Sequence, residues 1–343
     1  MIEAMAQTLP GDAFDWPVFG LPDDVRPALR RAVDQGAPAA LATLYATEGG
    51  APRGVGAQMV YAAGELSGFL SGGCVEADVA RHALSVLSER RPQRLVYGDG
   101  GPPDVKLACG SRIEVLVEAV EPGDRALRDL LALAEARLPA LWLSDGEVRA
   151  CIEPGRFANL PAPLRALADA QGLGGAQAAP FAAFRRFAPA LRLVVIGSDP
   201  IALAVLKFAA AMGVEAMLVR PKGPETAPDI PLAAYVRSTA AAALATLRPD
   251  PWTAVAVLSH DAELEHEALN AALATHAGYI GALGSRRRIP ERNQRLAEAG
   301  ATAADLARIR APIGLPIGGK SPWEIAVAIL AEIVAQTADE RDG

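Results

Sequence analysis

From residue 190 onward, short apolar runs alternate with segments of helical character. The apolar runs predict strands over 191–196, 214–219, 253–258 and 279–283. The intervening segments predict helices over 201–212, 262–274, 286–299 and 303–309. Parallel strands require long crossover connections, and helices of this length can cover both faces of such a sheet. This alternation therefore predicts a doubly wound parallel sheet for the C-terminal half of the chain.

A last helix is predicted from Ser321-Pro322-Trp323-Glu324, where a Ser cap is followed by Pro in the first turn and Glu three residues after the cap. Its apolar residues recur at helical spacing: Ile325, Ala326, Ile329, Leu330 and Ile333. An apolar stripe at the end of a chain is typical of a contact between protomers, so this helix predicts a homodimer.

The N-terminal half has a different pattern. A mostly apolar strand is predicted over 39–47, and two runs, 55–62 and 65–70, form a predicted hairpin across Ala63-Gly64. A helix over 75–90 follows, then strands over 94–97 and 113–118, a helix over 124–136 and a hairpin around Asp145-Gly146. The sequence thus predicts an N-terminal mixed α/β domain (1–155), a linker (156–189) and a C-terminal Rossmann-like domain (190–343).

Composition excludes several classes of function. The 343 residues carry a net charge of −7, with no cluster of Lys and Arg of the kind that binds duplex nucleic acid. No apolar run approaches the ~20 residues of a membrane span, and residues 1–15 do not resemble a secretory signal. Three widely spaced cysteines argue against a disulfide framework and for a reducing compartment. These features predict a cytoplasmic protein with no membrane or nucleic-acid partner.

The glycine turn before the helix over 75–90 is the strongest candidate site. It reads Ser71-Gly72-Gly73-Cys74-Val75-Glu76, with Cys74 at or beside the helix N-terminus. Unpaired N–H groups and the positive end of the helix dipole there favour anions, including a thiolate. Such a turn suits a ligand carrying both a soft metal and a phosphate. The alternative is a buried structural cysteine behind a tight turn. Cys151, in an apolar run, reads as a core residue.

Two glycine motifs in the C-terminal half resemble phosphate-binding loops. Gly197-Ser198-Asp199-Pro200 stands where a dinucleotide fingerprint belongs, but Asp199 replaces the second glycine and would face the pyrophosphate, so NAD(P) is disfavoured. Residues 314–321 match G-x-x-x-x-G-K-S literally, yet no buried strand precedes them and Pro316 removes a donor, which predicts a chance match. Arg286, Arg287 and Arg288 open a helix against its dipole, which favours either an anionic ligand or pairing with nearby acids.

Several motifs, in order along the chain, resemble those of one family. They are Ala46-Thr47-Glu48-Gly49-Gly50-Ala51-Pro52-Arg53, Gly56-Ala57-Gln58-Met59, Ser71-Gly72-Gly73-Cys74-Val75-Glu76, Cys109-Gly110-Ser111-Arg112-Ile113-Glu114-Val115, Tyr279-Ile280-Gly281-Ala282-Leu283-Gly284-Ser285-Arg286-Arg287 and Ala311-Pro312-Ile313-Gly314-Leu315. The chain resembles the XdhC/CoxI family, accessory proteins of xanthine dehydrogenase and related molybdenum hydroxylases. Asp199-Pro200 departs from the family's usual G-x-G-H turn.

The resemblance implies a maturation factor without catalytic turnover. Such a protein binds the molybdenum cofactor, works with a cysteine desulfurase and delivers the cofactor to a client molybdenum hydroxylase. By this resemblance Cys74 contacts the metal. The cofactor pocket would consist of Cys74, Gly72, Gly73, Ser71, Arg53, Gln58, Cys109 and Gly110.

Two alternatives remain at this level. The C-terminal domain is compatible with an NAD(P)-dependent oxidoreductase that binds the nicotinamide cofactor at Gly197. A scaffold that docks a desulfurase to a hydroxylase, without holding the cofactor itself, would also carry these motifs.

Overall fold

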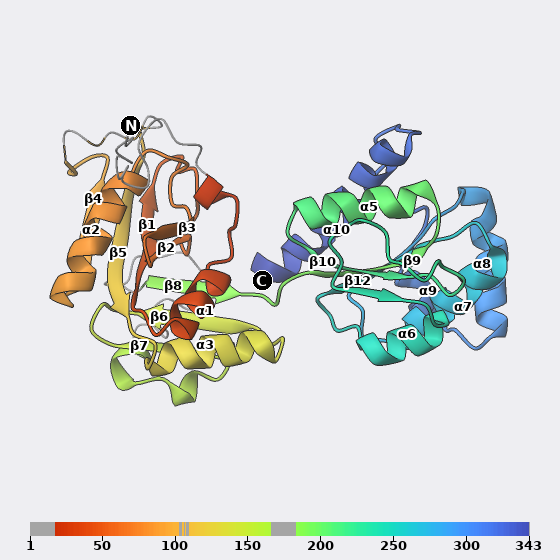
Figure 1. Ribbon diagram of the computed structural model, residues 1–343, viewed down its shortest axis with the longest axis horizontal. Coiled ribbons are helices and arrows are strands. Elements are labelled where there is room, and N and C mark those ends of the chain that lie inside the picture. Colours follow the sequence, from red (N-terminus) through yellow and green to blue (C-terminus); the bar gives the residue numbers. More distant parts are fainter. Residues whose placement is uncertain (1–17, 103–104, 106, 108–109, 166–182, 343) are drawn as a thin grey trace, which may run out of the picture. The chain divides into compact units, whose positions relative to one another are not determined.

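The computed structural model describes residues 18–102, 105, 107, 110–165 and 183–342 (Figure 1). The chain divides into two compact units, Met1–Phe187 and Ala188–Gly343. Within the described residues, no helix has both the length and the hydropathy that a membrane span requires.

The first unit is built on an antiparallel five-stranded sheet of order β3-β2-β1-β5-β4. Its elements are α1 (Arg26–Asp34), β1 (Ala39–Glu48), β2 (Gln58–Ala62), β3 (Glu65–Gly68), α2 (Glu76–Glu89), β4 (Gln93–Tyr97) and β5 (Arg112–Val120). The predicted hairpin is confirmed as β2 and β3, which pair in antiparallel register.

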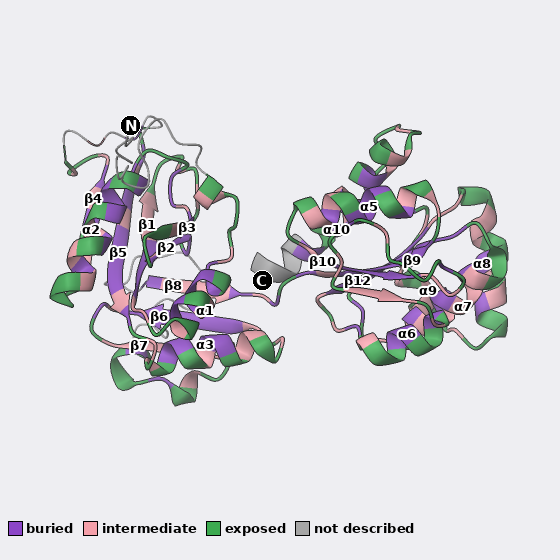
Figure 2. Ribbon diagram, in the orientation of Figure 1, coloured by how far each residue is buried: buried purple, intermediate pink, exposed green. Residues whose placement is uncertain are grey.

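Strand β1 is buried on both faces because helices cover both sides of the sheet (Figure 2). Ala42 packs in one core with Val79 of α2, whereas its neighbour Leu41 packs in another core with Leu29 of α1 and Leu127 of α3. Side chains alternate along a strand, so the near-continuous apolar run of β1 supplies both cores.

A smaller antiparallel sheet of order β7-β6-β8 completes the first unit. Its elements are α3 (Arg125–Glu135), β6 (Ala140–Ser144), β7 (Arg149–Ile152), the 3₁₀ helix η2 (Phe157–Asn159) and β8 (Ala183–Phe187). Part of the predicted linker is therefore a strand: β8 pairs with β6, and the division between the units falls after Phe187. Phe187 packs in the same core as Trp142, which explains why this segment belongs to the first unit.

The second unit confirms the predicted doubly wound fold. Six parallel strands have the order β11-β10-β9-β12-β13-β14. The elements are β9 (Arg192–Gly197), α5 (Pro200–Ala211), β10 (Glu215–Val219), β11 (Ala234–Val236), α6 (Ala240–Leu247), β12 (Thr253–Leu258), α7 (Ala262–Leu273), β13 (Tyr279–Ala282), η3 (Arg286–Arg288), α8 (Ile289–Glu298), α9 (Ala303–Ala307), β14 (Ile309–Arg310) and α10 (Pro322–Asp342). Sequence reasoning missed β11, α6 and β14; these are short elements whose order depends on long-range packing.

Helix α10 begins as predicted, with the Glu324 N–H directed at Ser321 Oγ and the Ser321 N–H at the Glu324 carboxylate. Its apolar stripe, however, is internal. Ala326, Ile329 and Ile333 are fully buried and pack in one core with α5. The argument for a homodimer from this stripe is therefore wrong, because the second unit itself covers it.

Candidate functional site

Cys74 lies in the loop that joins β3 to α2. Gly72 and Gly73 adopt φ angles of +88° and +116°, a backbone region that residues with a Cβ rarely enter. A Cβ at either position would meet no atom within 4 Å. The two glycines are therefore required by the loop conformation and not by close packing, and the space beside them is open. Cys74 itself is exposed, which contradicts the alternative of a buried structural cysteine.

The buried carboxylate of Glu76, at the first position of α2, organises this loop. One oxygen accepts the N–H groups of Leu70, Ser71 and Gly72 at 2.9, 2.7 and 3.1 Å. The other oxygen accepts the N–H groups of Gly73 and Val75 at 2.8 and 3.2 Å, and the Ser71 hydroxyl at 2.8 Å. The Ser71 oxygen in turn accepts the Cys74 N–H at 3.0 Å. The backbone that carries the exposed thiol is thus tied to a single buried acid.

This arrangement corrects the expectation of bare N–H groups ready for an anionic ligand. The N–H groups of Leu70, Gly72 and Gly73 already donate to Glu76, so a phosphate could use them only by displacing a carboxylate that is 1% exposed. Sequence reasoning missed the role of Glu76. An acid in the first helical turn, directly after a glycine loop, is the signal that could have revealed it.

The hydrogen bonds around Glu76 predict a pH dependence. Burial alone would raise the pKa of Glu76, but the donors from Ser71 and Leu70 outweigh it and hold the pKa below its ordinary value. A carboxyl group with a lowered pKa in the folded state stabilises the fold above the pKa of the unfolded chain, and this contribution is lost as the pH falls through the folded value.

We therefore expect the stability difference between wild type and Glu76→Gln to shrink as the pH falls below about 4, near the ordinary pKa of glutamate. Urea denaturation at a series of pH values measures it. A difference that stays constant from neutral pH to the acid limit would contradict this assignment of the carboxylate.

Arg53 lies close to the same loop, on Phe69. Its guanidinium carbon is 4.6 Å from the centre of the Phe69 ring, and its terminal nitrogen pairs with Asp23. Arg53 is thus held by an aromatic face and a carboxylate, and its remaining N–H donors are its means of contacting a ligand.

Gln58 lies inside the sheet and not at an open surface. It is 1% exposed, and its Nε2 donates to Thr43 Oγ1 at 3.1 Å. Met59, the next residue, packs in the core that contains Val75, and alternation along β2 directs Gln58 to the opposite face. The structure therefore does not bring Gln58 to the exposed face of the Cys74 loop.

The third predicted segment of the pocket starts at Cys109, which lies outside the described residues. Gly110 has a φ of +68°, and its N–H donates to Leu107 O at 3.0 Å. Pairing of Glu48 on β1 with Arg112 on β5 brings the first glycine motif beside this segment. A Cβ on Gly49 would stand 3.5 Å from the Ser111 Cα.

A shared core joins this end of the sheet to the Cys74 loop, since Leu44, Val75 and Ile113 pack together. Three motifs that are distant in sequence therefore meet at one end of the first unit. Within the described part of the chain no group of three or more His, Cys, Asp or Glu side chains could hold a metal ion, so Cys74 would act as a single protein ligand.

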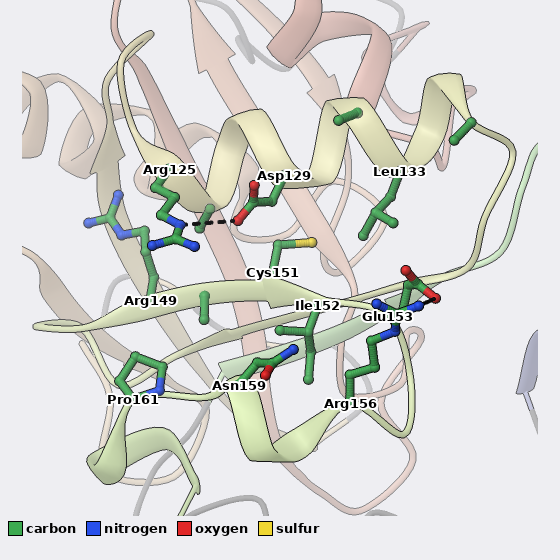
Figure 3. Close-up of a pocket in the computed structure, with 14 residues that line it drawn as sticks. Arg125, Asp129, Leu133, Arg149, Cys151, Ile152, Glu153, Arg156, Asn159 and Pro161 are labelled. Carbon is green, nitrogen blue, oxygen red and sulfur yellow. Dashed lines mark ion pairs between the residues drawn. The ribbon is translucent and has the colours of Figure 1, made fainter.

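The cavity drawn in Figure 3 contains the other described cysteine. It encloses about 560 Å³ between α3, β7 and η2. Cys151 is 4% exposed there, and burial followed by the nearby Asp129 charge raises the pKa of its thiol to about 12. Cys151 is thus a neutral core thiol, as the sequence indicated, and it does not give this cavity a reactive nucleophile.

Comparisons with known proteins agree with these motifs. Residues 32–98 match the model described as XdhC and CoxI family, and residues 193–333 match the XdhC Rossmann domain. The molybdenum cofactor insertion chaperone PaoD of Escherichia coli (strain K12) is 32% identical over 320 residues, which cover 92% of this chain and 89% of PaoD. The chain belongs to the XdhC and CoxI family.

Two further proteins support the same relationship. A Bacillus subtilis (strain 168) protein named as a probable component of xanthine dehydrogenase is 28% identical over 327 residues, covering 86% of this chain and 92% of that protein. A crystal structure described as a xanthine dehydrogenase from Bacillus halodurans superposes with a TM-score of 0.70 at 24% identity, covering 92% of this chain and 96% of that one. At this identity the structural likeness shows that the XdhC/CoxI fold is shared.

Proposed function

We propose that this chain is an insertion chaperone: it holds the molybdenum cofactor as cargo, with Cys74 as the protein ligand, and passes it to a client molybdenum hydroxylase. The relative PaoD is named a molybdenum cofactor insertion chaperone, and the Bacillus subtilis relative is named for xanthine dehydrogenase. The function requires a client enzyme, and a cysteine desulfurase if the cargo is sulfurated while it is held.

The observation that carries this proposal is an exposed thiol on a preorganised loop. Cys74 is open to solvent, while Ser71 and Glu76 beneath it are 4% and 1% exposed. A thiolate is a soft ligand, and a loop with little freedom to lose binds at a lower entropic cost. An exposed position also allows a client to take the cargo without the chaperone unfolding. Anionic parts of the cargo would need donors other than the loop N–H groups, and Arg53 is placed to supply them.

The test is anaerobic uptake of the molybdenum cofactor by the full chain, read as bound molybdenum and pterin fluorescence. Cys74→Ser keeps the shape of the loop and removes the soft ligand, so we expect at least about a tenfold loss of affinity, equivalent to ~1.4 kcal/mol. Cys151→Ala is the matched control and should bind as wild type does. Equal uptake by Cys74→Ser would remove the proposed role of this sulfur. A wild-type protein that captures client and desulfurase but never binds the cofactor would favour a scaffold.

The alternative of an NAD(P)-dependent oxidoreductase has less support. Asp199 Oδ1 accepts the Ala202 N–H at 2.9 Å, so a carboxylate occupies the donor that a pyrophosphate would use at the start of α5. Gly197 is required for another reason: a Cβ there would stand 2.0 Å from Leu258 O of the neighbouring strand. The glycine thus serves strand packing, and the turn does not provide a phosphate cradle.

A further inference from the structure

The second unit contains a large cavity that the proposed function does not use. It encloses about 1090 Å³ beyond the carboxyl ends of β9, β10 and β12. Strand β9 is flanked by β10 on one side and β12 on the other, which makes this the point where the strand order reverses. Ligands of doubly wound sheets bind in the crevice at such a point.

One wall of the cavity carries an unsatisfied acceptor. Asp199 Oδ1 caps α5, but Oδ2 is shielded from solvent and has no hydrogen-bond donor among the described residues. His260 lies beside it, with Nε2 at 3.4 Å from Oδ2. Buried carboxylate oxygens normally accept hydrogen bonds, so this atom is suited to a hydroxyl or amino donor of a ligand.

Another wall carries two cations, Arg220 and Lys222, which follow β10. Neither forms an ion pair with a described residue, although Arg220 is half-buried. The turn that holds them is fixed, because Tyr235 Oη donates to Pro224 O at 2.8 Å and Arg237 Nε donates to Gly223 O at 3.1 Å. Cations without a counter-charge on a fixed turn at a cavity wall are an anion-binding arrangement.

Two further acids of the cavity wall are engaged elsewhere. Asp261 caps α7 by accepting the Glu263 N–H at 2.9 Å, and Glu263 pairs with Arg295 at 2.8 Å. Together with Asp199 they leave this side of the cavity negative. A ligand with several phosphates would therefore meet repulsion, whereas one phosphate at the β10 side would not.

The charges are thus reversed relative to a dinucleotide site. There an anion sits at the turn after the first strand, and an acid after the second strand binds ribose hydroxyls. Here the acid, Asp199, follows the first strand, and the cations, Arg220 and Lys222, follow the second. We propose that this cavity binds a phosphate monoester of a polyhydroxylated group, a ribonucleoside monophosphate, with its phosphate at Arg220 and Lys222 and a hydroxyl at Asp199.

The test is equilibrium dialysis of the full chain against adenosine and cytidine 5′-monophosphates, with adenosine, inorganic phosphate and NADP⁺ for comparison. We expect a monophosphate to bind more tightly than adenosine, phosphate or NADP⁺. Arg220→Ala and Lys222→Ala should each weaken that binding by about tenfold, as loss of a charge-assisted hydrogen bond implies. Lys207→Ala, an exposed lysine of α5 outside the cavity, is the control and should leave it unchanged.

Asp199→Asn decides the orientation. Asparagine retains the helix cap, so the fold is preserved, but it removes the free carboxylate oxygen. We expect weaker monophosphate binding and little gain for NADP⁺. Tighter NADP⁺ binding by this variant, a wild type that binds no monophosphate at millimolar concentration, or binding insensitive to Arg220→Ala and Lys222→Ala would each overturn the proposal. Cofactor uptake at Cys74 is a separate measurement, so failure here does not decide the chaperone function.

Discussion

Glu76→Gln is expected to lower the free energy of unfolding of the first unit by about 2–4 kcal/mol, because hydrogen bonds to a charged acceptor are worth about 1.5–3 kcal/mol each and are not additive. The carboxylate accepts five backbone N–H groups and the Ser71 hydroxyl. The amide of glutamine replaces one oxygen with a donor, which would face N–H groups that also donate.

Urea denaturation at neutral pH measures this loss, and Glu89→Gln is the matched control. Glu89 is exposed on the same helix, and its removal should change stability by less than about 0.5 kcal/mol. Glu76→Gln should also weaken cofactor uptake although Cys74 is intact, because the loop would lose its preorganised shape. A variant as stable as the Glu89→Gln control would show that the loop does not depend on this acid.

Glu265→Ala in α7 is expected to have the largest effect on the second unit, about 3–5 kcal/mol, the cost of breaking a buried ion pair. Glu265 is 3% exposed and Arg292 is 7% exposed; the carboxylate binds Arg292 Nε and also pairs with Arg288 at 3.0 Å. Arg292 donates further to Leu283 O at 2.9 Å, at the carboxyl end of β13. Alanine would leave a buried guanidinium without its counter-charge.

The control on the same helix is Glu263→Ala. Its ion pair with Arg295 is exposed, and such pairs contribute about 0–1 kcal/mol. Thermal and urea unfolding of both variants give the comparison. Replacing Glu265 and Arg292 together by methionine should restore much of the loss, because a buried pair can often be exchanged for apolar packing. If Glu265→Ala costs no more than Glu263→Ala, the network does not stabilise the unit.

This network also explains part of the arginine cluster that the sequence singled out. Arg288 pairs with Glu265, so the interpretation as a basic turn bound to nearby acids is confirmed for that residue. Arg286 and Arg287 are exposed and have no ion pair with a described residue. An anionic partner for these two remains a prediction.

Sequence alone predicted the elements whose signal is local. Apolar runs between glycine turns marked β9, β10, β12 and β13, and caps and periodicity marked α2 and α10. Right-handed crossovers then leave few ways to arrange alternating strands and helices, which is why the parallel sheet was predictable. β8 was not, because five residues after a long irregular stretch form a strand only by pairing with β6.

The tertiary structure decided the features on which function depends. Glu76 accepts N–H groups from a loop that folds back over it, Gln58 faces the interior away from Val75, and the apolar stripe of α10 is covered by α5. Local sequence sets which conformations a segment prefers. Whether a side chain is exposed, buried or paired depends on residues far along the chain that pack against it, and the pattern of a single segment contains no record of them.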